Sequence, residues 1–381
     1  MRASRISLAA VLLVALLTVL GCGKTSSDGR AQTTATWSQR VVSGLSPSPR
    51  SPACVVFDRD RGRMLLFGGF TGDTSNGTGV DYNDLWSFDP KANAWTELEP
   101  ASSPPPAGNG CAGVYAARAK ELLLYDLASD NSQPGSTSSL WAYDTKSDGW
   151  TELHASGDRP PTLGLPAAAY DVRGGRMFLF GGQTDLLQES NDLYAYNPAS
   201  NNWQKIDVKG TRPAGRHGEA LVYDSDTDRL LMFGGISDKY VQSPESGVAP
   251  EQTSYRDTWA FDLKSVSWTE LKPAGKVLGP SEPAAVYDPA LKSVVSYTAG
   301  VGPDGHLEAQ LQVYDSRENA WTTLPQAADW PSARWNPALL LDPGSSSILL
   351  YGGQQVVSKS ETTSGGVVGT PLGDIWDCRL R

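Results

Sequence analysis

Residues 221–235, LVYDSDTDRLLMFGG, contain two short apolar runs separated by a polar turn. The first run ends in a tyrosine and an aspartate, and the second ends in a phenylalanine and two glycines. Short runs rich in aromatic and β-branched residues, bounded by Asp or Gly, are typical of β-strands. The stretch therefore predicts two consecutive strands, which we call strand a and strand b.

The same pattern recurs along the chain, and two further runs follow it. Glycine pairs close strand b at 68–69, 181–182, 234–235 and 352–353. A third run, strand c, lies at 84–89, 192–197 and 257–262, and a fourth, strand d, carries the tryptophan of Trp-Thr-Glu-Leu at 95–98, 150–153 and 268–271. Four strands in each repeat predict the blades of a β-propeller.

The repeat resembles the kelch repeat, whose marks are the glycine pair and the spaced aromatic residues. The resemblance covers residues 36–380 and implies an all-β, six-bladed kelch-type β-propeller. Two repeats lack the glycine pair, at 126–127 and 298–299, but Tyr125 and Tyr297 keep the aromatic position before it. Large rings in strands c and d are expected to fill the wedge between neighbouring blades.

The two ends of the repeat region complement each other. The last repeat stops after its strand c, at residues 375–380, while Trp37 begins an isolated strand d at the amino end. We therefore expect the segment around Trp37 to complete blade 6 and to close the ring. Closure would remove the open sheet edges that favour aggregation.

The amino-terminal residues predict export rather than fold. Arg2 and Arg5 precede an apolar stretch at 8–20, which is too short to span a bilayer but suits a signal peptide. It ends in Leu20-Gly21-Cys22, which resembles the lipobox of bacterial lipoproteins. We expect a signal peptide over 1–22 with lipidation of Cys22, a flexible tether over 23–35 and the propeller over 36–381. The protein would then be lipid-anchored to a bacterial membrane, at the outer membrane or its periplasmic side.

Composition excludes several classes of function. The formal charge of −10 disfavours nucleic acid as a partner, because a polyanion would be repelled. His154, His217 and His306 fall in different repeats without metal-ligand spacing, so we expect loop histidines and no metal. No nucleophile elbow or phosphate-binding loop is present, so the sequence predicts no catalytic residue and no cofactor.

Loop lengths indicate where a ligand would bind. The a–b and c–d turns are constant, whereas the b–c loops vary and are longest in blades 6, 1 and 4, at 354–375, 70–85 and 236–258. Loops on a rigid scaffold commonly carry binding sites. Arginine and tryptophan are frequent binding anchors, and five of them lie where the chain enters the first strands of these blades: Arg50, Arg216, Arg334, Trp330 and Trp335. The alternative for the arginines is a structural one, in which they brace neighbouring blades.

The sequence favours a monomeric, membrane-tethered binding module for an envelope protein or a glycan. One alternative is a sugar-acting enzyme, because the kelch resemblance includes a six-bladed sialate mutarotase. Another alternative is a structural element of an envelope complex. Cys54 and Cys111 begin adjacent innermost strands one residue out of register, so we expect buried thiols rather than a disulfide.

Overall fold

The computed structural model describes residues 33–381 except 52, 73–78, 109–110, 127–137, 185–186, 244–246, 278, 280–281, 302–306, 328 and 356–368. The chain divides into two compact units, Met1–Thr33 and Thr34–Arg381, and the strands described below all belong to the second. The predicted signal peptide, the lipidated Cys22 and His306 lie outside the described residues. Among the described residues, no helix is long and apolar enough to cross a membrane.

The described part of Thr34–Arg381 is built from β-strands, which confirms the all-β prediction. Six sheets each hold a run of four antiparallel strands, labelled here as blades in chain order. The strands of blades 1 to 3 are β2 (Cys54–Asp58), β3 (Arg63–Thr71), β4 (Val80–Asp89) and β5 (Ala94–Leu98); β6 (Ala112–Ala116), β7 (Glu121–Asp126), β8 (Ser139–Asp144) and β9 (Gly149–Glu152); and β12 (Ala167–Asp171), β13 (Arg176–Phe180), β15 (Leu193–Asn197) and β16 (Asn202–Lys205).

The other three blades follow the same order. Their strands are β17 (His217–Asp224), β18 (Arg229–Ser243), β20 (Thr258–Asp262) and β21 (Ser267–Leu271); β22 (Ala284–Asp288), β23 (Ser293–Val301), β24 (Leu307–Asp315) and β25 (Ala320–Thr323); and β27 (Ala338–Asp342), β28 (Ser347–Tyr351), β31 (Ile375–Leu380) and β1 (Ala35–Arg40). Short additional strands are β10 (Ser156–Gly157), β11 (Leu163–Gly164), β14 (Gln183–Thr184), β19 (Gly247–Ser254), β26 (Arg334–Trp335), β29 (Gln354–Gln355) and β30 (Thr370–Pro371).

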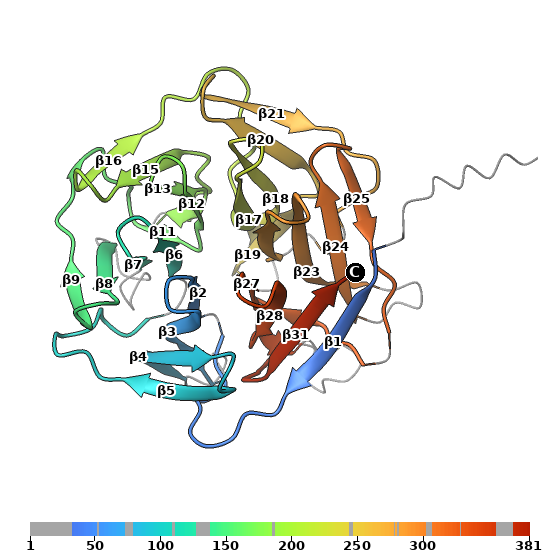
Figure 1. The fold of residues 1–381 in the computed structure, drawn as a ribbon. Coiled ribbons are helices and arrows are strands. Elements are labelled where there is room, and N and C mark those ends of the chain that lie inside the picture. Colours follow the sequence, from blue (N-terminus) through green and yellow to red (C-terminus); the bar gives the residue numbers. More distant parts are fainter. Residues whose placement is uncertain are drawn as a thin grey trace, which may run out of the picture. The chain divides into compact units, whose positions relative to one another are not determined.

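The two ends of the unit Thr34–Arg381 meet in one sheet. Strand β1 pairs antiparallel with β31, in a register that runs from Ala35 opposite Leu380 to Arg40 opposite Ile375. The backbones of Thr34 and Arg381 add two hydrogen bonds, of 2.9 and 3.0 Å. Figure 1 shows the first strand beside the last one. The first strands of the blades contact one another in a cycle, β2 to β6, β12, β17, β22, β27 and back to β2.

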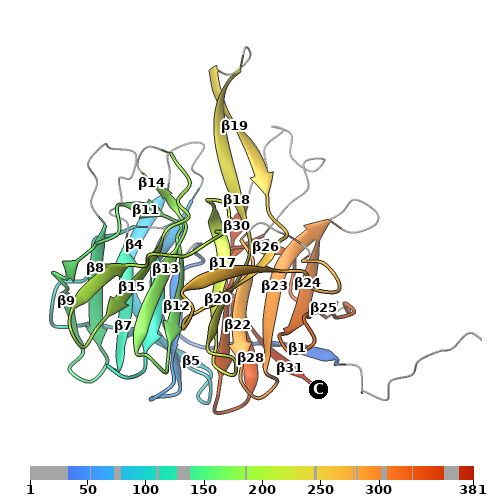
Figure 2. The same ribbon diagram turned by 90° about the horizontal axis from the view of Figure 1, so that it is seen from above.

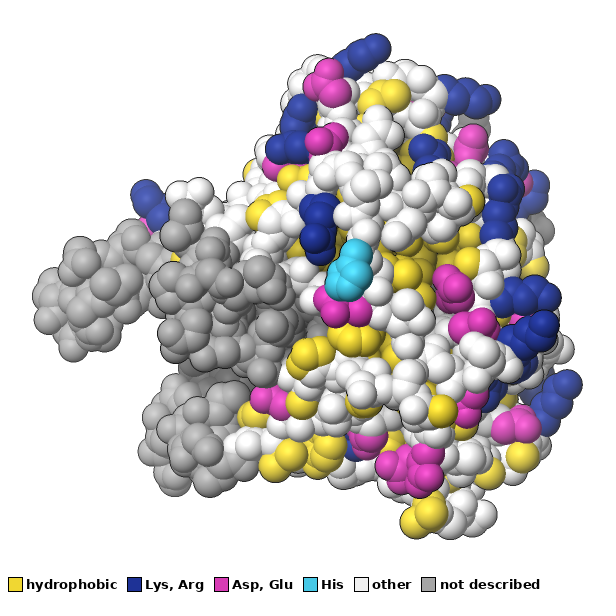
Figure 3. Space-filling model, turned by 90° about the vertical axis from the view of Figure 1, so that its left-hand side faces the viewer, with side chains coloured by type: hydrophobic (Ala, Val, Ile, Leu, Met, Phe, Trp, Pro, Cys, Tyr) yellow, Lys and Arg dark blue, Asp and Glu magenta, His cyan; other side chains and the backbone are white. Residues whose placement is uncertain are grey.

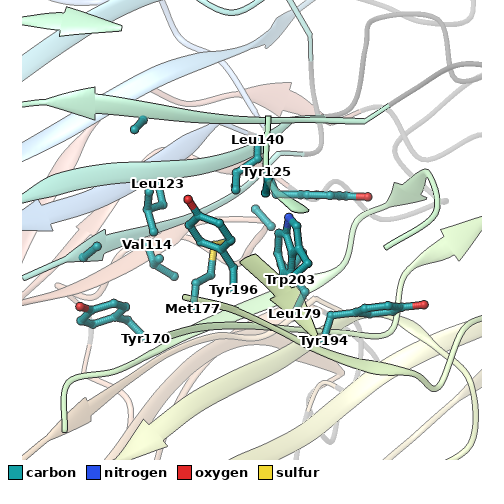
Figure 4. Packing of buried hydrophobic residues seen from close by; sticks show 14 of the residues in the cluster. Val114, Leu123, Tyr125, Leu140, Tyr170, Met177, Leu179, Tyr194, Tyr196 and Trp203 are labelled. Carbon is teal, nitrogen blue, oxygen red and sulfur yellow. The ribbon is translucent and has the colours of Figure 1, made fainter. Parts of the chain in front are cut away.

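Aromatic side chains fill the spaces between neighbouring sheets, as predicted for the strand-d tryptophans, but their partners across blades come from strand b rather than strand c. Each strand-d tryptophan meets the aromatic residue that ends strand b of the preceding blade. Trp203 lies 6.3 Å from Tyr125 between ring centres, and both rings are visible in Figure 4. The equivalent pairs are Trp150 with Phe67, Trp268 with Phe180, Trp321 with Phe233, Trp37 with Tyr297 and Trp95 with Tyr351. Such edge-on pairs contribute about 0.5–1.5 kcal/mol each beyond the area they bury.

One cysteine prediction was wrong. Cys54 and Cys111 form a disulfide, with their Cα atoms 5.9 Å apart, and Cys378 is a buried free thiol. The expectation of opposed side chains assumed that both cysteines follow strand alternation. Cys111, however, precedes β6, which begins at Ala112, so alternation does not fix the direction of its side chain. The disulfide links the first strands of blades 1 and 2.

Candidate functional site

The two faces of the molecule differ in their connections. The turn face carries the a–b and c–d turns, and the loop face carries the b–c and d–a connections. On the loop face, β18 continues past the blade and pairs with β19, from Ile236 opposite Ser254 to Ser243 opposite Gly247. Figure 2 shows this hairpin projecting well beyond the rest of the fold. The sequence predicts only a long loop over 236–258, because its polar composition lacks the apolar alternation of a half-buried strand.

Arg216 lies at the base of this hairpin, immediately before β17. Its side chain is fully buried, and both terminal nitrogens donate to the carboxylate of Asp257, over 2.6 and 2.8 Å. A further hydrogen bond of 2.9 Å reaches the carbonyl of Gly234, the first glycine of the pair that ends strand b. The Tyr255 ring covers the guanidinium, with its centre 3.9 Å away. Little donor capacity is left for a ligand.

Arg50 and Arg334 repeat this arrangement in blades 1 and 6. Their side chains are 2 % and 1 % exposed, and they pair with Asp84 and Asp374. Both also donate to the carbonyl of the first strand-b glycine, over 3.2 and 2.9 Å. The buried side chains of Arg50, Arg216 and Arg334 and their internal partners favour the structural alternative, in which the arginines brace the blades. Each arginine joins the start of strand a to the end of strand b and the beginning of strand c.

The three aspartates serve a second donor, which the sequence pattern Asp-x-Trp encodes. The indole nitrogens of Trp86, Trp259 and Trp376 donate to them over 2.7, 2.7 and 2.6 Å. Burial opposes ionisation of Asp257, but the hydrogen bonds from Arg216 and Trp259 outweigh it and lower the pKa of this carboxyl. The carboxylate therefore stays charged and holds both partners.

The two tryptophans that the sequence singles out have different positions. Trp330 is 7 % exposed and packs edge-on against Trp37, with 6.2 Å between ring centres. It belongs to the hydrophobic core at the contact between blades 5 and 6, where its ring packs on other side chains of the fold. Trp335 lies in β26, remains half-buried and pairs with Gln354 of β29. Of the five predicted ligand contacts, Trp335 alone keeps a partly exposed side chain.

A pair of ionisable groups that the sequence does not predict lies beside the hairpin. Nδ1 of His217 is 3.0 Å from both carboxylate oxygens of Glu189, which comes from the b–c connection of blade 3. The same carboxylate accepts hydrogen bonds from the backbone of Asp238 and from the side chain of Gln183. Burial opposes protonation of His217, but Glu189 outweighs it and raises the pKa of the imidazole. The pair connects blade 3 to the base of the hairpin.

Glu219 is the most unusual group near this mouth. It is 6 % exposed, and neither carboxylate oxygen makes a well-formed hydrogen bond within the described residues. Burial raises its pKa to about 8, although nearby backbone amides and Arg216 oppose the rise. The carboxyl packs on Gly181, where a Cβ atom would come within 2.3 Å of Oε1. Glu219 is therefore a neutral acid at pH 7, held in a space that a glycine leaves open.

The Glu219 carboxyl makes stability depend on pH, and a glutamine should remove this dependence. Because its folded pKa of about 8 exceeds the ordinary 4.5, the folded state keeps a proton that the unfolded state has lost. The stability that this retained proton contributes is fully present below pH 4.5 and is lost as the pH rises through 8. Glu219→Gln should gain on the order of 3 kcal/mol over the wild type at pH 7, and little at pH 5. Urea unfolding of both proteins from pH 5 to 9 checks this, and parallel pH profiles would contradict it.

The residues two positions before the first alanine of strand a (Ala167, Ala220, Ala284 and Ala338 in blades 3 to 6) lie at the mouth of the central channel on the loop face. In the four blades where this position is described, its φ is positive, at 53° for Leu165, 64° for Gly218, 50° for Glu282 and 48° for Asn336. Non-glycine residues rarely adopt this conformation, and such positions are concentrated at functional sites. Glu282 extends over Gly218, where a Cβ would lie 2.9 Å from its Cγ. Burial raises the pKa of Glu282, and His217 and Asn336 oppose the rise.

Beneath this rim lies a cavity of about 240 Å³. It is lined mainly by small residues of the first strands and the segments before them, among them Ala53, Ala112, Pro166, Ala284, Pro337 and Ala338. Within the described residues, no group of three or more potential metal ligands is present. The mouth therefore offers carboxyl, amide and imidazole groups around a floor of small side chains, which suits recognition by hydrogen bonds. The feature of the sequence that points to this mouth is Glu219, a glutamate inside the largely apolar strand HGEALVYD, residues 217–224.

Comparisons with known proteins agree with this architecture. The family model of the KLHDC2/KLHL20/DRC7 Kelch-repeats domain matches residues 125–353, and that of the Kelch motif matches 49–102. The structure titled "Structure of YjhT" superposes with a TM-score of 0.54 at 17 % identity, over 77 % of this chain and 92 % of that one. At this identity the likeness shows the fold.

The chain spans only part of the length of the curated relatives it matches. The chain is 28 % identical over 249 residues to Leucine-zipper-like transcriptional regulator 1 homolog of Drosophila melanogaster. It is 26 % identical over 228 residues to Kelch domain-containing protein 3 of Bos taurus. These matches cover 62 % and 56 % of this chain, but 23 % and 54 % of the two relatives. Because a kelch-repeat family model covers more than half of its length, the chain belongs to the kelch-repeat domain family.

Proposed function

We propose that this protein is an exported binding module that recognises an envelope protein or a glycan through its loop face. The observation that carries the proposal is the β18–β19 hairpin, which, among the described residues, extends blade 4 beyond the other blades on the loop face. A projecting two-stranded hairpin presents the backbone edges of its two strands to a partner. Kelch propellers are binding scaffolds, and loops held by a rigid scaffold commonly form their contact surfaces.

The base of the hairpin is held firmly, which supports a role in recognition. Tyr255 stacks on buried Arg216, and its hydroxyl lies 3.1 Å from that of Ser237. The backbone of Asp238 donates to Glu189 of the neighbouring blade. Holding a projecting element in place before binding reduces the conformational entropy lost on association. Trp335 and the channel rim of Glu282 and Asn336 complete the proposed surface.

Shortening the hairpin tests the proposal. Asp238 and Gln252 face each other across it, so residues 239–251 can be replaced by an Asn-Gly turn, which suits a two-residue hairpin connection. The shortened protein should unfold at nearly the wild-type temperature, while capture of a partner from native envelope extract, or of a glycan from an array, falls at least tenfold. The matched control is Lys91→Ala, in an exposed c–d turn of the opposite face. Equal capture by the wild type and the shortened protein would contradict binding through the hairpin.

We also propose that the module is tethered to a bacterial membrane by lipid on Cys22. The support comes from the sequence, in which a basic start, a short apolar stretch and Leu20-Gly21-Cys22 follow one another. Replacing Cys22 by serine should move the protein from the membrane fraction to the soluble fraction. Retention of Cys22→Ser in membranes would contradict the lipid anchor.

A further inference from the structure

A second opening of the central channel lies on the turn face. A cavity of about 340 Å³ opens there, between the ends of the first strands of the blades. Its lining is mainly apolar and includes the aromatic residue that precedes the strand-a aspartate or its equivalent in five blades: Phe57, Tyr115, Tyr170, Tyr223 and Tyr287. Leu341 holds this position in blade 6. Small-molecule sites are typically apolar cavities of about this size with a few polar groups at defined places.

The hydroxyls of Tyr115, Tyr170 and Tyr223 are hydrogen-bonded to groups of the turns. The Tyr115 hydroxyl donates to Asp60 over 2.5 Å, and the Tyr223 hydroxyl donates to Asp228 over 2.7 Å. Burial and these carboxylates raise the pKa of both phenols, so they remain uncharged donors. The Tyr170 hydroxyl accepts a hydrogen bond from the backbone of Arg118. The aromatic rings are thus held in place beside the opening.

The rim of this opening is basic in blades 1 to 3. Arg59 lines the cavity with an exposed side chain. Arg118 and Arg173, at neighbouring turns, are also exposed and donate to the carbonyls of Arg173 and Ser225. Within the described residues, none of these three guanidinium groups pairs with a carboxylate. An electropositive rim attracts anions despite the overall charge of −10, because local charges dominate at short range.

Turn chemistry explains why the basic side chains dominate this rim. The strand-a aspartates Asp58, Asp171 and Asp224 are buried and accept hydrogen bonds from the backbone of their own turns. These carboxylates are occupied by their own turns, while Arg59 and Arg173, which follow Asp58 and Asp171, have exposed side chains. Figure 3 shows Lys and Arg side chains gathered along its right-hand edge, the side that faces the viewer in Figure 1.

We propose that this opening binds a small amphipathic organic anion. Its aromatic or aliphatic body enters the channel among the rings, and its carboxylate meets Arg59, with Arg118 and Arg173 adding positive potential. Guanidinium groups suit carboxylates because their planar donors match the two oxygens. The site is separate from the proposed loop-face function, since the two surfaces lie on opposite faces of the propeller.

Indole-3-acetate and tryptamine provide matched probes, since they share the indole body and differ in the sign of the head group. Isothermal titration calorimetry of the propeller should show binding of indole-3-acetate at least tenfold tighter than that of tryptamine. Arg59→Gln should weaken indole-3-acetate binding about tenfold, the loss expected for one charge-assisted hydrogen bond. Lys91→Gln, on the same face but in a c–d turn, should leave the affinity unchanged.

Two further variants test the channel lining and the independence of the two faces. Leu340→Trp places a large ring in the channel lining and should abolish binding of indole-3-acetate. The protein with the shortened β18–β19 hairpin should bind indole-3-acetate like the wild type, whatever becomes of its loop-face partner. Equal affinity for the two indoles, or wild-type affinity in Arg59→Gln, would overturn the proposal, and so would wild-type affinity in a folded Leu340→Trp protein. The Arg59 change lies on an exposed side chain, so it tests the site even if Leu340→Trp fails to fold.

Discussion

Replacing Trp37 by alanine should lower the free energy of unfolding by about 3–5 kcal/mol, the usual cost of removing a buried large aromatic residue. Trp37 is 3 % exposed, although it lies within the first few described residues of the chain. Its ring packs edge-on against Tyr297 of blade 5 and against Trp330 in the connection that enters blade 6. Alanine would leave a cavity between blades 5 and 6 and weaken the attachment of β1 to β31.

Urea unfolding followed by circular dichroism measures this effect, and Gln39→Ala is the matched control. Gln39 lies in the same strand with an exposed side chain, so its removal should change the unfolding free energy by less than about 0.5 kcal/mol. Deleting residues 33–40 should have a larger effect, because it leaves β31 with an unpaired edge that favours association. A Trp37→Ala protein as stable as the wild type would mean that β1 is not required for the fold.

Replacing Arg216 by methionine should cost about 3–5 kcal/mol, because it leaves the carboxylate of Asp257 without its charged partner. Arg216 is fully buried, and Asp257 is mostly buried and keeps two hydrogen bonds from it. Methionine retains much of the side-chain volume and removes the charge and the donors. The loss should therefore come from the broken ion pair rather than from a cavity.

Arg229→Met is the control, since Arg229 is exposed and lies 3.6 Å from the partly exposed Asp262. Such surface pairs contribute about 0–1 kcal/mol, so this variant should unfold almost like the wild type. Adding Asp257→Asn to Arg216→Met should recover part of the lost stability by removing the unpaired charge. If Arg216→Met instead kept wild-type stability and lost partner binding, the arginine would be a ligand contact and the bracing role would be wrong.

The repeat itself could be predicted from the sequence to a large extent. The glycine pairs, the aromatic positions before them and the strand-d tryptophans all follow from local patterns, and the structure places them as neighbours across blades. The meeting of the two chain ends was also predictable, because an incomplete last repeat and an isolated first strand complement each other. The pattern of a strand lies within a short segment, and in this chain the same pattern recurs in each repeat.

The candidate site was predicted less well. The sequence singled out Arg50, Arg216 and Arg334 as residue types that bind ligands, but it could not show that Asp84, Asp257 and Asp374 occupy them. Those partners lie 34 to 41 positions away, across the variable b–c connection. The sequence placed each arginine correctly at the entry to strand a. Its pairing with an aspartate across the b–c connection could not be read from a local pattern.

The sequence by itself determined the strands, their order and the large rings between blades, since strand formation and the spacing of apolar residues are properties of short segments. Only the tertiary structure decided which polar groups are buried, which cysteines pair and how far the blade 4 connection projects. The neutral Glu219 illustrates the difference. Its residue type is acidic, but its pKa of about 8 arises from burial between two blades, a property of packing and not of sequence.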